Sequence, residues 1–132
     1  ELTRTYQDAN AMMDSMTICK FAMEMLGTEF MEAYLDLFRD ICGWEMTKEE
    51  FLESGERIVN LKRAYQVRCG VSRKDDRLPA RMTKRRGRGG AGDHVPKVEP
   101  MLDLYYENRG WDMYGRPTPE TLERLDLAWV NA

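Results

Sequence analysis

The chain has 132 residues, of which 42% are hydrophobic and 33% charged, and its formal net charge is −3. This length is typical of one domain with a single core that buries roughly two thirds of the unfolded surface. The small acidic excess gives no reason to expect nucleic acid as a partner, and no apolar run approaches the ~18 residues that a membrane span needs. We therefore expect one globular domain over residues 1–132.

The cysteine and histidine content limits the chemistry that this chain can do alone. Its three cysteines, Cys19, Cys42 and Cys69, contain no CxxC pair, so neither a zinc knuckle nor a dithiol redox motif is encoded. A sparse, odd set of cysteines is typical of a reducing cytoplasm, and we predict that location. With His94 as the one histidine, no self-contained imidazole metal site or hydrolase triad is expected. The chain begins with Glu1 rather than Met, which we interpret as a sign of a longer parent protein.

The apolar pattern predicts helices and contains no convincing run of alternating strand residues. We expect a first helix over residues 4–14, which resumes after Cys19 and continues until Gly27. A second helix is predicted over residues 28–42, with Gly43 as its stop. Its apolar residues follow one helix face and comprise Phe30, Tyr34, Leu37, Phe38 and Ile41.

A third helix has the clearest start, because Thr47 and Glu50 have the spacing of a capping box. This helix is expected to end near Gly70. The glycine at position 55 lies within its apolar stripe and indicates the close approach of another backbone, which we assign to the second helix. The stripe that we expect to be buried comprises Phe51, Gly55, Ile58, Leu61 and Tyr65.

Residues 71–98 show no helical periodicity and are predicted to form a long irregular loop. Its glycine–arginine tract, residues 86–92, has too little apolar surface to offset the entropy lost on ordering, so we expect it to be mobile. A fourth helix is predicted over residues 99–108 with Gly110 at its end, and a short last helix begins at an N-cap, Thr118. The predicted fold class is therefore all-α, an irregular domain of about five helices.

Charged residues alternate in sign over residues 73–81, and this pattern has two interpretations. One is a connector in which Arg and Asp side chains tie the loop to a helix. The other, which is the more usual case, is a solvated run of charges. RNA binding is not expected, because no aromatic residue lies between Arg73 and Val98 to stack on a base.

Asp14 precedes Cys19 by five positions within an apolar, methionine-rich segment. In an unbroken helix this separation turns the two side chains roughly 140° apart, so they serve one site only if the backbone turns between them. Ser15 and Thr17 favour such a break. A carboxylate can bind the amine and ring N–H of a heterocycle, and a thiolate can bind iron. Spacing alone favours the alternative of an Asp that ends a helix and a Cys buried as a small hydrophobe.

Several segments, in their order along the chain, resemble the C-terminal domain of the aldehyde:ferredoxin oxidoreductases. These are tungsten or molybdenum enzymes with two pterin cofactors and one [4Fe–4S] cluster. The resemblance covers nearly the whole chain, and the glycine–arginine tract is its least family-like part. The segments that carry it are residues 14–19, of pattern DxxxIC, and residues 43–50, 55–61, 72–79, 105–112 and 115–120.

The resemblance implies roles for the first of these segments. In the family, an Asp-x-x-x-Leu-Cys loop supplies the fourth cysteine of the cluster, and its Asp hydrogen-bonds the pterin. Cys19 is then the metal ligand and Asp14 the pterin-binding carboxylate, while Ile18 stands where Leu is usual, a swap of similar volume. No residue is assigned a catalytic role. The CxxCxxxC run that supplies the other cluster cysteines is absent, so we expect the isolated chain to bind neither cluster nor pterin and to be inactive.

By this resemblance, the longer enzyme oxidises an aldehyde with water to a carboxylic acid at a tungsten or molybdenum bis-pterin site and passes electrons through the [4Fe–4S] cluster to ferredoxin. The implied partners are the remaining domains of that enzyme, ferredoxin and a small aldehyde, with neither nucleic acid nor a membrane. Two alternatives stay open. The chain is a piece of the catalytic subunit of an aromatic acyl-CoA reductase of the same family, or it is a stand-alone helical interaction module without cofactors.

Overall fold

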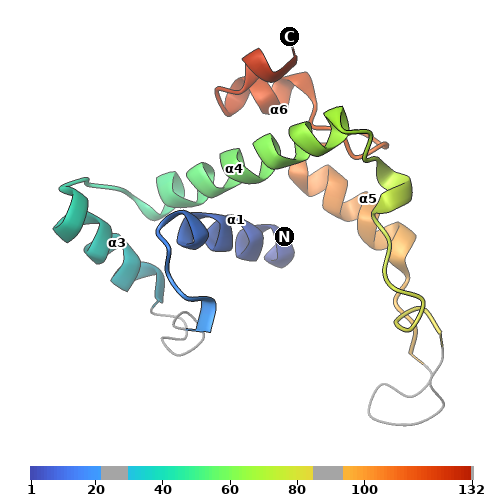
Figure 1. Cartoon of the computed structure of the whole chain (residues 1–132), viewed down its shortest axis with the longest axis horizontal. Helices are drawn as coiled ribbons and strands as arrows, with labels where there is room; N and C mark the ends of the chain where they lie inside the picture. Colours follow the sequence, from blue (N-terminus) through green and yellow to red (C-terminus); the bar gives the residue numbers. More distant parts are fainter. Residues whose placement is uncertain (22–29, 85–93, 132) are drawn as a thin grey trace.

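The computed structural model describes residues 1–21, 30–84 and 94–131, which form helices joined by turns (Figure 1). Over these ranges there is no strand, and the all-α prediction with about five helices is confirmed. The α-helices are α1 (Leu2–Ser15), α3 (Phe30–Cys42), α4 (Lys48–Arg68), α5 (Val98–Arg109) and α6 (Pro119–Arg124), and two short 3-10 helices are η2 (Arg73–Asp75) and η3 (Ala128–Asn131).

Two predicted features fall partly or wholly outside the described ranges. Lys20 and Phe21 are helical, which confirms that helix resumes after Cys19, but the rest of that stretch is not among the described residues. The same holds for the glycine–arginine tract at 86–92. None of the helices in the described ranges is both long and apolar enough to cross a bilayer.

The longest helix, α4, organises the other helices around itself. In Figure 1, α1 and α5 lie on one side of α4, α6 and η3 lie on the other side, and α3 lies near its first turns. Between α1, α3 and α4, an apolar cluster forms from Ala9, Met12, Met31 and Phe51. A second cluster, centred on Leu122, Leu125 and Leu127, holds α6 to the residues that follow it.

The predicted helix ends agree with the structure. Thr47 and Glu50 form both bonds of the capping box at the start of α4. Gly110 ends α5 in the left-handed conformation, with φ 65°, and Gly43 follows α3 with φ 68°. The hydroxyl of Thr118 accepts the Thr121 amide at the start of α6. These ends were predictable because each depends on contacts within four or five residues.

Gly55 does allow close backbone approach, but the predicted partner was wrong. A Cβ built at Gly55 would lie 2.0 Å from the carbonyl oxygen of Asp8. The backbone that approaches is therefore that of α1, not that of the second helix. The spacing of residues along α4 shows where a neighbour comes close, but it cannot show which helix that neighbour is.

The predicted apolar stripes are buried only in part. On α4, Phe51 is fully buried, whereas Leu61 is 38% exposed and Tyr65 is 68% exposed. On α3, Leu37 and Ile41 are likewise exposed. The buried positions of α4 beyond Phe51 and Gly55 are instead polar, namely Glu56, Asn60 and Arg63. Paired polar groups occupy this part of the interior, so a rule based on apolar residues alone misplaced the buried face.

The charged segment after α4 is tied to the helices, which confirms the connector interpretation. Arg63 of α4 forms a two-bond pair with the carboxylate of Asp76. Arg73 bonds Glu99 and Asp103 of α5, each at 2.7 Å. The remaining charged residues of the segment are exposed, so the solvated-run interpretation holds only for them.

Candidate functional site

The C-terminal end of α1 forms a turn that separates Asp14 from Cys19. The Ile18 amide donates to the Met13 carbonyl, and the Thr17 amide donates to the Asp14 carbonyl, both at 3.1 Å. The Ile18 side chain packs against the buried cluster that contains Met13. These two hydrogen bonds and the accompanying apolar contact define a Schellman motif, which ends a helix and redirects the chain. The predicted break between the carboxylate and the thiol is therefore present.

Thr17 occupies the left-handed position of this motif, with φ 57°. Glycine is the usual residue there, and a β-branched side chain at positive φ is a genuine outlier. The left-handed conformation costs roughly 1–2 kcal/mol for an L-residue with a Cβ. Strain of this kind persists only where the surrounding structure imposes it, and it gathers at functional sites.

Asp14 lies in the last turn of α1, where its charge is unfavourable. The carbonyl groups at a helix C-terminus carry partial negative charge, so a carboxylate there costs about 0.3–1 kcal/mol. The last turn of α1 contains no basic residue to offset this cost. Asp14 and Thr17 are therefore both residue types that helix stability disfavours at their positions. Such departures are expected where function, and not stability, decides the residue.

Asp14 also lines a cavity of about 600 Å³ between α1, α4 and α5. Cations from two elements, Lys20 and Lys62, share the cavity with the aromatic ring of Tyr105. A cavity that combines a carboxylate, ammonium groups and ring faces suits a planar polar group. Its full lining is Gln7, Asn10, Ala11, Asp14, Lys20, Val59, Lys62, Arg63, Gln66, Asp76, Leu102, Tyr105, Tyr106 and Trp111.

Two of these cavity residues were missed from the sequence for different reasons. Lys20 directly follows Cys19, so its place beside the motif was available as a signal. Lys62 lies far along the chain and reaches the cavity only because α4 packs along α1. No local pattern around Lys62 distinguishes it from any other exposed lysine of a helix.

Cys19 is exposed, and this overturns the alternative in which it is buried as a small hydrophobe. Cys42 and Cys69 are also free and exposed, which makes them natural controls for its reactivity. Within the described ranges, no group of three or more His, Cys, Asp or Glu side chains is placed to hold a metal ion. Within these ranges Cys19 therefore belongs to no cluster of candidate ligands. Ile18, in contrast, is half-buried and anchors the turn to the core.

Buried ion pairs at the other end of α1 fix the direction of this helix. The Arg109 side chain is fully buried and donates to Asp8 Oδ1 and to Gln7 Oε1, each at 2.6 Å. Arg4 donates to Glu56 of α4 at 3.0 Å. Burial raises the pKa of Asp8 above its usual value, although the Arg109 guanidinium opposes this shift. Because α1 is held at these points, the turn at its far end is presented in a defined direction.

A hydrogen-bonded cluster of Arg63, Asp76 and Tyr106 forms part of the cavity wall near α5. Tyr106 donates its hydroxyl proton to Asp76, which also binds Arg63. Burial alone would raise the pKa of Asp76, but the hydrogen bonds from Arg63 and Tyr106 hold that pKa below its usual value. Burial, together with this hydrogen bond, raises the pKa of Tyr106 to about 12. At neutral pH the group is therefore a carboxylate held by a neutral phenol and a guanidinium.

Comparison with known proteins shows which family this chain belongs to. A family model described as aldehyde ferredoxin oxidoreductase, domains 2 and 3, matches residues 1–127. The chain belongs to the aldehyde ferredoxin oxidoreductase family. The tungsten-containing aldehyde ferredoxin oxidoreductase of Pyrococcus furiosus is 35% identical over 125 residues, which cover 93% of this chain and 20% of the relative. The enzyme of the same name from Thermococcus kodakarensis is 34% identical with the same coverage.

Two further proteins, one compared by sequence and one by solved structure, are also similar to this chain. A protein named aliphatic sulfonate oxidoreductase, WOR-like subunit, from Pyrococcus furiosus is 30% identical over 126 residues, covering 89% of this chain and 20% of the relative. A solved structure, the active site complex BamBC of benzoyl coenzyme A reductase with 1,5-dienoyl-CoA, superposes with a TM-score of 0.61 and 30% identity. It covers 76% of this chain and 14% of the matched chain. The chain thus spans about a fifth of the length of the curated relatives.

The residues at the end of α1 fit the tungsten-pterin and iron–sulfur cofactors that this family implies. A carboxylate that lines a cavity can accept hydrogen bonds from a heterocycle, and an exposed thiol can ligate iron. The Schellman turn allows both on one short segment. Asp14 and Cys19 are therefore a chemically suitable donor set for these groups.

Proposed function

We propose that residues 1–132 form one helical domain of a longer enzyme that oxidises an aldehyde to a carboxylic acid at a tungsten or molybdenum bis-pterin site. Electrons pass through a [4Fe–4S] cluster to ferredoxin in this proposal. The observation that carries it is the turn at the end of α1, which exposes Cys19 and leaves Asp14 lining a cavity. The identity to tungsten-containing aldehyde ferredoxin oxidoreductases supports the choice of reaction.

Each residue of the turn has a role in this proposal. The Cys19 thiolate is one ligand of the cluster, and the Asp14 carboxylate accepts N–H hydrogen bonds from a pterin edge. Ile18 holds the turn against the core, so that carboxylate and thiolate keep a fixed relation. When bound, the metal–pterin group supplies the redox chemistry in which an aldehyde and water give a carboxylic acid, two protons and two electrons.

The remaining ligands, the substrate pocket and the ferredoxin contact belong, in this proposal, to parts of the enzyme outside this chain. We therefore expect the isolated chain to be colourless and inactive. The sparse, free cysteines agree with a reducing cytoplasm as its location.

The test uses the longer protein that contains this chain, purified without oxygen. With Cys19→Ala, we expect the four-iron cluster signal in electron paramagnetic resonance to be lost and the bound iron to fall by more than half. With Cys42→Ala or Cys69→Ala, which remove equally exposed thiols, both readouts should be unchanged. An intact cluster in the Cys19→Ala protein would show that the ligand assignment is wrong.

The structural likeness to a benzoyl coenzyme A reductase complex favours a second candidate function, the reduction of an aromatic acyl-CoA. The two reactions run in opposite redox directions, which makes them separable in one assay. The longer protein should reduce a viologen dye when given an aldehyde. Dye reduction that is instead driven by a dienoyl-CoA, with no response to aldehydes, would favour the second candidate. A protein with neither cofactor would favour the helical interaction module.

A further inference from the structure

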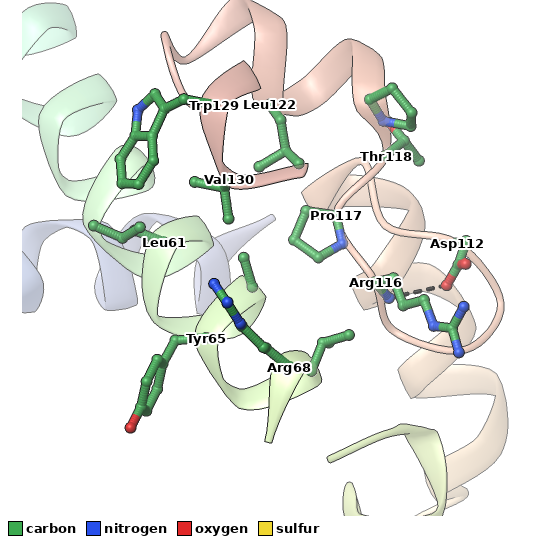
Figure 2. Close-up of a pocket in the computed structure, with 13 residues that line it drawn as sticks. Leu61, Tyr65, Arg68, Asp112, Arg116, Pro117, Thr118, Leu122, Trp129 and Val130 are labelled. Carbon is green, nitrogen blue, oxygen red and sulfur yellow. Dashed lines mark hydrogen bonds between the residues drawn. The ribbon is translucent and has the colours of Figure 1, made fainter. Parts of the chain in front are cut away.

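A groove of about 710 Å³ lies on the side of α4 that faces away from α1, and nothing above assigns it a role (Figure 2). Leu61 and Tyr65 of α4 form one wall, and Leu122, Val130 and Trp129 form the other. Trp129 is 66% exposed and Tyr65 is 68% exposed. The family model ends at residue 127, so part of this second wall lies beyond the matched range.

The α4 wall has the sequence pattern of a buried face. Leu61 and Tyr65 are spaced i, i+4, so they lie together on the part of α4 that lines the groove. Phe51 is fully buried against α1, but no described residue covers Leu61 and Tyr65 to the same degree. A large apolar patch that carries aromatic residues marks an interaction surface more often than an ordinary solvent-facing one.

A charged group in the groove indicates what covers it. Figure 2 shows the Arg68 side chain extending from α4 into the space between Leu61 and Pro117, whereas Arg116 turns away toward Asp112. Among the described residues, Arg68 has neither an ion pair nor a hydrogen-bond partner for its guanidinium. An occupant that buries this cation must bring an anion, and a carboxylate matches the planar guanidinium best.

We infer that this groove binds a segment of the longer polypeptide outside this chain, which presents an apolar side chain between Trp129 and Leu61 and a carboxylate to Arg68. The inference rests on the proposal that the chain is part of a longer enzyme. The chain spans about a fifth of its relatives, so most of such a protein lies outside it. Trp, Tyr and Arg are the residue types that contribute most to binding where two surfaces meet, and the groove contains all three types.

Iodide quenching of tryptophan fluorescence in the longer polypeptide tests whether the groove is covered. Trp129→Phe should remove emission from the fraction that iodide cannot reach, because Trp129 is covered in the intact protein. Arg68→Glu repels the carboxylate and should make Trp129 quenchable, whereas Arg116→Glu, which changes a cation that turns away, should not. If Trp129 is quenchable without any substitution, or if Arg68→Glu leaves it protected, the inference is overturned.

Cross-linking identifies the occupant. In an Arg68→Lys protein, a zero-length carbodiimide should join the new amine to a carboxylate outside residues 1–132, which peptide mass spectrometry locates. A cross-link only to carboxylates within these residues, or only between two molecules, would overturn the inference. The intact mass decides separately on the proposed function: a gene product of 132 residues contradicts that proposal, whereas a longer product with an open groove contradicts only the inference about Arg68 and Trp129.

Discussion

The two ends of α1 are held in place by different chemistry. Near its start, Asp8 joins a buried ion pair with Arg109 of α5, and Arg4 joins a partly exposed ion pair with Glu56 of α4. At its end, the turn is held by apolar contacts of Ile18 and by backbone hydrogen bonds, with a strained threonine in the middle. The residues suited to bind cofactors therefore lie at the less stabilised end. The firmly held end gives that turn its direction without taking part in its chemistry.

The largest expected effect is at the firmly held end. Replacing Arg109 by Met should lower the free energy of unfolding by about 3–5 kcal/mol, because Asp8 is left buried without its main partner. Urea unfolding measures this change. Arg39→Met removes an exposed pair with Asp36 on α3 and should cost less than about 1 kcal/mol. Equal losses in the two variants would mean that burial does not distinguish these pairs.

A close backbone contact at the same end predicts the next effect. Gly55→Ala should lower the free energy of unfolding by about 2–3 kcal/mol, because the added Cβ meets the Asp8 carbonyl and forces α1 and α4 apart. This loss should appear although alanine favours a helix over glycine by about 1 kcal/mol. As a control, Glu53→Ala on the exposed face of α4 should change stability by no more than about 0.5 kcal/mol. A Gly55→Ala protein as stable as the parent would refute the contact.

The Asp76 group predicts a pH dependence of stability. Because hydrogen bonds from Arg63 and Tyr106 outweigh burial and hold the pKa of Asp76 below its usual value, its contribution is present above pH ~4 and is lost as pH falls further. Asp76→Asn should cost about 1–3 kcal/mol at neutral pH and flatten the acid limb of the stability curve. Asp126→Asn, at an exposed carboxylate, should leave that limb unchanged.

Tyr106, which donates its hydroxyl proton to Asp76, predicts a loss of stability at high pH. The pKa of Tyr106 is raised to about 12, so its contribution is present below pH ~10 and is lost as pH rises toward 12. Absorbance titration of the tyrosines should show one group that ionises late. That group should ionise earlier in the Asp76→Asn protein.

The smallest effect is expected at the weakly held end, and it has the opposite sign. Thr17→Gly should raise the free energy of unfolding by about 0.5–1 kcal/mol, because relief of the left-handed strain exceeds the entropy that glycine loses on folding. Thr5→Gly, within α1, should instead lower it by about 0.3 kcal/mol, because glycine is a weaker helix former than threonine. Thermal unfolding of the two variants provides the comparison. If both are destabilised, Thr17 is not strained.

The sequence allowed the break after Asp14 to be predicted, because Ser15 and Thr17 act on their own backbone and the motif closes within a few residues. Through resemblance to a family, it also led to the prediction that Cys19 is a metal ligand. It did not reveal that Lys62 shares a cavity with Asp14, or that Arg68 extends into a groove where it has no partner among the residues that the structure describes. Both facts depend on which face of α4 meets α1, which no spacing within α4 determines.

Taken by itself, the amino-acid sequence determined the helical class, the caps at Thr47, Gly110 and Thr118, and the turn that separates Asp14 from Cys19. Each of these features results from interactions between residues that are close in sequence. The energies of such interactions do not depend on where the segment packs in the fold. Only the tertiary structure decided which backbone meets Gly55 and which carboxylate receives Arg109. Those contacts join residues far apart in the chain, and a buried charge becomes favourable only after packing has brought its partner beside it.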